Sequence, residues 1–377
     1  MKLPKQLRRR AVGLAVWLLL ILLFHVLCRF LPQWADYGRE YIGLFKLGVS
    51  WICSPLPFCL AELLCVLFIL WLLIYLLRSI FQILHSQNRL LSLSDRLLRL
   101  LTVLAGLYFA FCLTWGINFY ATSFQQEIGL SSSGGTVTQL QQVTEYFARQ
   151  LSRSAAMVPR SKNGVFQADY QDIFARSSEV YQAAAVKYPC LELDAPPPKA
   201  MLFSRLMSYM GFTGVTFPLT QENCLNVDAP SCMLPATVAH EQAHSRGFAS
   251  EQECNFLAVL ACTSCSDPVY LYSGWLFGYL SLSNALYRAD PNRAQEIYAS
   301  LPETVKADLA SRRAYWQQFE GPVNTAAESV YDVMLKGYGE SDGIQSYGTA
   351  VDLLIAYYLP RAERRWTPSV PVLSAAS

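Results

Sequence analysis

Two histidines spaced four residues apart are the clearest chemical signal in this chain. His240 and His244 are separated by three residues, the first of which is Glu241. Residues four apart lie on one face of a helix, so both imidazoles can reach the same point. Two imidazoles at this spacing supply half of a tetrahedral zinc site, and Glu241 beside them can activate a metal-bound water. The chain has only 4 histidines, and the other two fall in its apolar N-terminal part.

A catalytic zinc site needs a third protein ligand, with the fourth position left for water. Gly247 can adopt a positive φ, which lets the chain leave the helix and turn back toward the metal. The spacing resembles the metzincin pattern HExxHxxGxxH, but here Ser250 holds the third ligand position and is no zinc ligand. The next residue, Glu251, begins a segment that resembles the second helix of gluzincins, whose E-x-x-x-[DN] pattern supplies a carboxylate.

Helical geometry favours Glu251 over Glu253 as the third ligand. Asn255 lies about 40° from Glu251 around a helix, whereas Glu253 lies about 200° away. We therefore expect one carboxylate and two imidazoles on zinc, with Asn255 orienting a ligand through a hydrogen bond; the expected ligands are His240, His244 and Glu251. Alternatively, Glu251 is an acidic residue of the first helical turn, where it suits the helix dipole.

This residue set is typical of peptide-bond hydrolysis. Zinc lowers the pKa of its water, and Glu241 takes the water proton and passes it to the leaving amine. A further donor should stabilise the oxyanion. No histidine remains for that task, so a tyrosine or arginine is expected. Tyr347, in a glycine-rich turn before a predicted helix, is the candidate.

The composition indicates that this motif is held at a membrane. Hydrophobic residues make up 53% of the 377 residues and charged residues only 15%, against roughly 25% in soluble proteins. The net charge is +2, with no Lys/Arg-rich run away from the apolar segments, so no nucleic-acid partner is expected. The 11 cysteines are dispersed; Cys224 with Cys232 and Cys262 with Cys265 could form disulfides, or all could be unpaired small hydrophobes.

Three apolar runs predict transmembrane helices at about 11–31, 55–77 and 100–120. Lys and Arg are more frequent in the N-terminus and in segment 78–99 than in the loop after the first span. The positive-inside rule therefore places the N-terminus and segment 78–99 in the cytoplasm. Residues 1–120 would form a multi-pass anchor in the cell membrane, and residues 121–377 an extracytoplasmic domain.

The rest of the chain is predicted to be mainly helical. Proline suits the first turn of a helix and glycine its end, so Pro235 and Gly247 delimit a metal-binding helix over about 235–246. Residues 212–220 are rich in β-branched and aromatic residues and are broken by a proline, which predicts an edge strand or hairpin. Such a strand could pair with an extended peptide, or the segment could be a purely structural hairpin. Further helices are expected at about 137–157, 170–187, 250–263, 273–288, 292–299, 302–318, 324–336 and 346–358.

Most of the chain resembles an uncharacterised bacterial family of membrane proteins, known only as a domain of unknown function. Its members have three N-terminal spans followed by a domain that carries the HExxH motif. The resemblance implies a zincin-like, gluzincin-type metallopeptidase domain and supplies no established substrate. The matching segments are 208–215, 233–248, 251–258 and 342–348.

The sequence therefore predicts a membrane-anchored zinc metallopeptidase that acts on a peptide or protein outside the membrane. The alternative is a metal-binding sensor or scaffold that retains the fold without turnover, although the intact Glu241 favours an enzyme. Intramembrane proteolysis is disfavoured because the segment around His240 is too polar for a lipid-exposed span.

Overall fold

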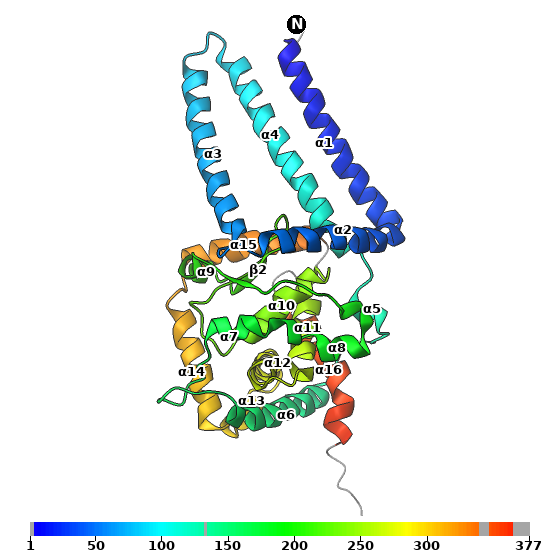
Figure 1. Cartoon of the computed structure of the whole chain (residues 1–377), viewed down its shortest axis with the longest axis vertical. Helices are drawn as coiled ribbons and strands as arrows, with labels where there is room; N and C mark the ends of the chain where they lie inside the picture. Colours follow the sequence, from blue (N-terminus) through cyan, green and yellow to red (C-terminus); the bar gives the residue numbers. More distant parts are fainter. Residues whose placement is uncertain (1–3, 132–133, 339–346, 365–377) are drawn as a thin grey trace, which may run out of the picture.

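The chain folds mainly into α-helices, as predicted, with one small sheet. The computed structural model describes residues 4–131, 134–338 and 347–364. Three long helices extend from one side of a helical domain, and the N-terminus lies at their far end (Figure 1). The connection between the second and third of these helices lies at that same far end.

The three extended helices are long and apolar enough to cross a membrane: α1 (Lys5–Phe30), α3 (Leu60–Leu84) and α4 (Arg89–Thr114). Helices α3 and α4 include most of the basic segment 78–99, which was expected to connect two spans, and residues 85–88 alone form the connection. Helix α4 begins within this polar stretch because Asn88 caps it: the Asn88 side chain accepts the Leu91 N–H at 3.0 Å.

A further long helix, α2 (Pro32–Cys53), was not predicted and lies across the domain ends of the three apolar helices (Figure 1). Its exposed large side chains recur at helical spacing along one face: Trp34, Tyr37, Tyr41, Leu44, Phe45 and Ile52. An apolar stripe on a helix that otherwise carries charges is typical of a helix lying in a membrane interface. Because charged residues interrupt the aromatic ones, the sequence of α2 contains no continuous apolar run and was not predicted as a span.

The domain core forms around α12 (Pro268–Ala289), and burial against α6, α10 and α11 explains why residues 268–287 of this helix carry no charge. Long side chains such as Tyr270, Tyr272 and Tyr279 are almost fully buried there. The other helices of the domain are α5 (Phe124–Glu127), α6 (Val137–Ser154), α7 (Tyr170–Ala175), α8 (Gln182–Lys187), α9 (Ser204–Tyr209), α10 (Leu234–Ser245), α11 (Glu251–Ser264), α13 (Pro291–Ala299), α14 (Glu303–Gln317), α15 (Pro322–Gly337) and α16 (Tyr347–Arg364).

The sheet has the order β1-β3-β2, with β1 (Lys199–Ala200) parallel and β2 (Gly214–Thr216) antiparallel to β3 (Asn223–Leu225). The predicted edge strand is therefore present as β2, shorter than the segment 212–220. Helix α10 packs directly against β2 and β3. The two pairs of cysteines considered above are not bonded, since all 11 cysteines are free.

Hydrogen bonds join the sheet to the start of α3. The Glu222 carboxylate, next to β3, accepts the first two N–H groups of α3 at 3.1 and 3.0 Å. Glu62, in the first turn of α3, accepts the N–H groups of Leu202 and Phe203 at 2.9 Å each. A carboxylate in an otherwise apolar helix can signal function, but here Glu62 fastens the helix to the domain.

Candidate metal centre

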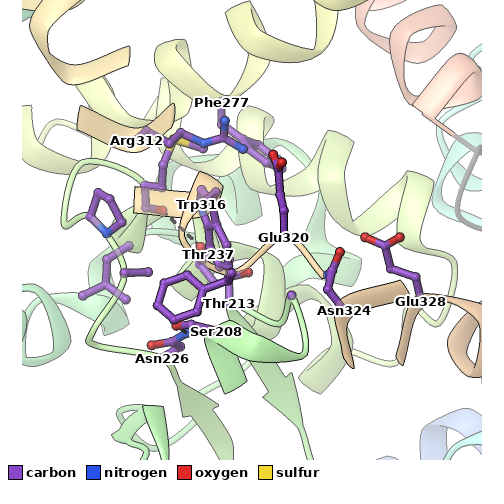
Figure 2. Close-up of a pocket in the computed structure, with 16 residues that line it drawn as sticks. Ser208, Thr213, Asn226, Thr237, Phe277, Arg312, Trp316, Glu320, Asn324 and Glu328 are labelled. Atoms are coloured by element: carbon purple, nitrogen blue, oxygen red, sulfur yellow. Dashed lines mark hydrogen bonds between the residues drawn. The ribbon is translucent and has the colours of Figure 1, made fainter. Parts of the chain in front are cut away.

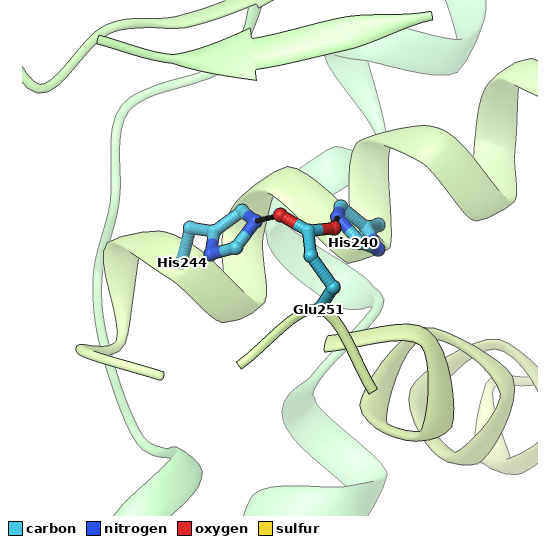
Figure 3. A group of neighbouring side chains, drawn as sticks. All are labelled: His240, His244 and Glu251. Carbon is cyan, nitrogen blue, oxygen red and sulfur yellow. Dashed lines mark ion pairs between the residues drawn. The ribbon is translucent and has the colours of Figure 1, made fainter. Parts of the chain in front are cut away.

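Two imidazoles on α10 and one carboxylate at the start of α11 face each other (Figure 3). Nε2 of His240 lies 3.2 Å from Oε2 of Glu251, and Nε2 of His244 lies 3.5 Å from Oε1. All three donor atoms lie within 4.8 Å of one another. Ligands placed tetrahedrally at about 2.0–2.2 Å from zinc are about 3.3 Å apart, and both His–Glu distances are close to this spacing.

The local sequence explains how the carboxylate reaches the helix that precedes it. Pro235 lies in the first turn of α10, where its missing N–H has no intrahelical acceptor to lose. Gly247 has a φ of +86°, a conformation that favours glycine, and it reverses the chain after α10. Helix α11 then begins at Glu251, so a short turn brings the third candidate ligand back to the two histidines.

The hydrogen bonding of His244 favours a cation between it and Glu251. Its Nδ1 lies 2.8 Å from the carbonyl oxygen of Phe248, and a carbonyl can only accept, so Nδ1 carries the hydrogen. In a neutral imidazole, Nε2 then presents a lone pair to the Glu251 carboxylate. Two lone pairs at 3.5 Å need a shared proton or a metal ion between them. The donor set therefore fits zinc.

Glu251 is also held by a tyrosine that the sequence did not identify. The hydroxyl of Tyr331, on α15, donates a hydrogen bond to Oε1 of Glu251. Burial raises the pKa of Glu251, but hydrogen bonds and charge from His240 and His244 outweigh it and hold that pKa well below its usual range. Tyr347, the predicted donor, is the first residue of α16, and its side chain lies outside the described part of the structure.

Glu241 points to the sheet side of the same site. Its Oε2 accepts a 2.8 Å hydrogen bond from the hydroxyl of Thr216 in β2, and its side chain is almost completely buried. Burial raises the pKa of Glu241, whereas protonation of either neighbouring histidine and the hydrogen bond from Thr216 act against the increase. A carboxylate in this setting can accept a proton close to the metal position.

The remaining candidates lie on different faces of α11. Asn255 lines the same cavity as the two histidines, and its role in orienting a ligand stays a prediction. Glu253 turns away and accepts the N–H of Gln125 at 3.1 Å. The structure thus places Glu251, and not Glu253, beside the histidines, as the helical spacing predicts.

The candidate ligands border a cavity of about 450 Å³, which is large enough for several residues of a peptide. Edge strand β2 forms one wall, and aromatic side chains form much of another. Among these, the Trp115 ring lies 5.0 Å from the ring of His244, centroid to centroid. The site therefore combines three metal-binding groups, a buried carboxylate and an open strand edge.

Comparison with known proteins gives one family. The family described as a protein of unknown function (DUF3810) matches residues 37–355, and the chain belongs to it. This assignment agrees with the predicted membership of an uncharacterised family and adds no activity. No curated protein and no solved structure matches the chain.

Proposed function

We propose that this member of the DUF3810 family is a membrane-anchored, zinc-dependent metallopeptidase. The observation that carries the proposal is the meeting of His240, His244 and Glu251 at the ligand spacing of zinc, with Glu241 one residue from the first ligand. When bound there, zinc would lower the pKa of a coordinated water and polarise the scissile carbonyl.

The residues around the metal position divide the other tasks of peptide hydrolysis. Glu241, held by Thr216, accepts the proton of the attacking water and delivers it to the leaving amine. The free edge of β2 can align an extended substrate by backbone hydrogen bonds. Tyr331 lines the same cavity and fixes the carboxylate ligand through its hydroxyl.

The competing proposal is a metal-binding sensor or scaffold of the same fold. Such a protein needs the three ligands but has no use for a buried carboxylate aimed at the site, nor for a cavity of about 450 Å³ beside it. Both features support turnover over metal sensing alone.

Zinc analysis and one conservative substitution test the proposal. Purified full-length protein should contain one zinc per chain, and His240→Ala should lose most of it. Glu241→Gln should keep the zinc but lose cleavage of a random peptide pool that the wild type degrades. Zinc-free wild type would reject the metal site, and equal cleavage by wild type and Glu241→Gln would reject the base. Zinc retained without any cleavage would favour the sensor or scaffold.

We further propose that the domain lies outside the cell membrane, with the N-terminus in the cytoplasm. Basic residues flank the N-terminus and the 85–88 connection, which lie at one end of the apolar helices, while the domain lies at the other (Figure 1). Single cysteines can test this in a cysteine-free variant. Lys162→Cys, in an exposed domain turn, should react with an impermeant maleimide on intact cells, whereas Gln87→Cys should react only after lysis. The reverse pattern would contradict the orientation.

A further inference from the structure

A second cavity of about 320 Å³ adjoins the one at the metal centre (Figure 2). Both cavities are lined by Gly211, Thr213, Thr237 and Phe277, so they adjoin at these residues, and the two together are called the cleft here. Polar side chains line the second cavity where α14 meets α15. They are Arg312, Glu320, Asn324 and Glu328. A bound chain can therefore extend from the candidate metal centre toward these polar side chains.

The opposite half of the cleft is apolar and is built partly by a membrane-spanning helix. Phe111 lies in the last turn of α4, and Trp115 and Phe119 lie within five residues after the end of this helix. Met334 and Leu335 of α15 line the same half. Because α4 is one of the three candidate spans, this apolar end of the cleft lies at the domain end of a helix that can cross a membrane.

The outer surface of α2 supports the same placement of the membrane. Its exposed stripe of Trp34, Tyr37, Tyr41 and Phe45 covers one face of a helix that lies across the ends of α1 and α4 (Figure 1). Tryptophan and tyrosine side chains settle at the membrane–water interface. Both α2 and α4 therefore put the metal centre within a few side chains of the lipid surface.

From this arrangement we propose that the substrate is a membrane-anchored polypeptide, cut in the segment next to its anchor. Apolar residues emerging from the lipid occupy the half of the cleft formed by Phe111, Trp115 and Phe119, and the polar residues that follow occupy the half at Arg312 and Glu328. The scissile bond lies between these halves at the metal centre. This inference rests on the proposed peptidase activity and specifies the substrate class for it.

Anchored peptides with spacers of different length test the substrate class. The full-length protein is reconstituted in phospholipid vesicles with quenched-fluorescent random decapeptides, each joined to a palmitoyl chain by two or twenty Gly/Ser residues. These spacers reach about 8 and 25 Å on average. Both substrates partition onto the same vesicles, so their surface concentrations match. Separate pools carry the anchor at the N- or the C-terminus, so that both directions of the bound chain are tested.

We expect the two-residue spacer to give at least a tenfold higher kcat/KM than the twenty-residue spacer for one of the two anchor positions, with no cleavage by Glu241→Gln. Equal or faster cleavage of the long-spacer peptide would overturn the membrane-proximal substrate and leave the peptidase intact. Equal cleavage of the same decapeptides without an anchor would do likewise. No cleavage of any pool above the Glu241→Gln level would reject the peptidase itself, and the substrate class with it.

Discussion

Replacing Gly214 by alanine should displace the proposed base while leaving the three metal-binding groups in place. Gly214 lies in edge strand β2, and a Cβ built there would lie 2.7 Å from Oε1 of Glu241 and 3.0 Å from its Cγ. On another side the same Cβ would lie 3.0 Å from Cδ1 of Leu225, so the added methyl group cannot simply turn away. The candidate ligands are not among its nearest neighbours.

The distance sets the size of the expected effect. Ordinary van der Waals contact begins at 3.4 Å, so the carboxylate oxygen must move by 3.4 − 2.7 Å, or about 0.7 Å, unless the strand moves instead. A misplacement of about 1 Å in a catalytic group can cost about 10²-fold in rate. We therefore expect Gly214→Ala to lower kcat between about tenfold and a hundredfold, with KM changed by less than about twofold.

Steady-state cleavage of a peptide degraded by the wild type, measured together with zinc content, tests this reasoning. The matched control is Gly48→Ala in α2, where an added Cβ meets nothing within 4 Å and should leave kcat unchanged. A wild-type kcat in Gly214→Ala with zinc retained would refute the assignment of Glu241 as the positioned base. Loss of zinc in proportion to activity would show instead that the methyl group disturbs the metal ligands.

Three further substitutions probe other parts of the structure. Tyr331→Phe removes a hydrogen bond to a charged ligand and should weaken zinc binding by about 10- to 100-fold in chelator competition; unchanged affinity would contradict its role. Asp308→Asn should lower the free energy of unfolding by about 3–5 kcal/mol, because the buried carboxylate pairs with Arg160 at 3.1 Å and accepts the Tyr272 hydroxyl; an unchanged melting temperature would contradict this. Burial lowers the pKa of Lys46 to about 8, so its charged form destabilises the fold at pH 7, and Lys46→Met should add about 3 kcal/mol. Because the unfolded chain binds more protons above that pKa, wild-type stability should rise from pH 8 to 10.5, and a rise of equal size in Lys46→Met would exclude this lysine as the cause.

The sequence predicted helix α10 and the position of Glu251 beside it well, because the constraints on this part of the chain are local. The spacing of His240 and His244, a proline at the helix start and Gly247 at its end all act within two turns, and α10 begins and ends within a residue of the predicted bounds. The position of Glu251 is also set locally, because Gly247 with its positive φ ends α10 and reverses the chain only a few residues before α11 begins.

What the sequence could not predict depends on contacts between distant segments. Tyr331 is one of 21 tyrosines, and nothing around it differs from an ordinary amphipathic helix; only the packing of α15 over the site brings its hydroxyl to Glu251. Helix α2 did leave a signal, because Trp34, Tyr37, Tyr41 and Phe45 follow a helical period. A search for uninterrupted apolar runs overlooks such a stripe.

The N-terminal helices also contact the candidate metal centre. The boundary predicted at residue 120 separates two stretches that meet at the site, because the Trp115 ring packs against His244 from the anchor side. Arg39 of α2 lies over the ring of Phe248, the residue whose carbonyl orients His244, and donates to the carbonyl of Thr122 at 2.8 Å. A soluble fragment starting after residue 120 would lose both contacts together with the apolar half of the cleft. The candidate ligands therefore pack against the end of a membrane helix, so their distance from the lipid surface is fixed. A domain joined to its anchor by a flexible linker would have no such fixed distance.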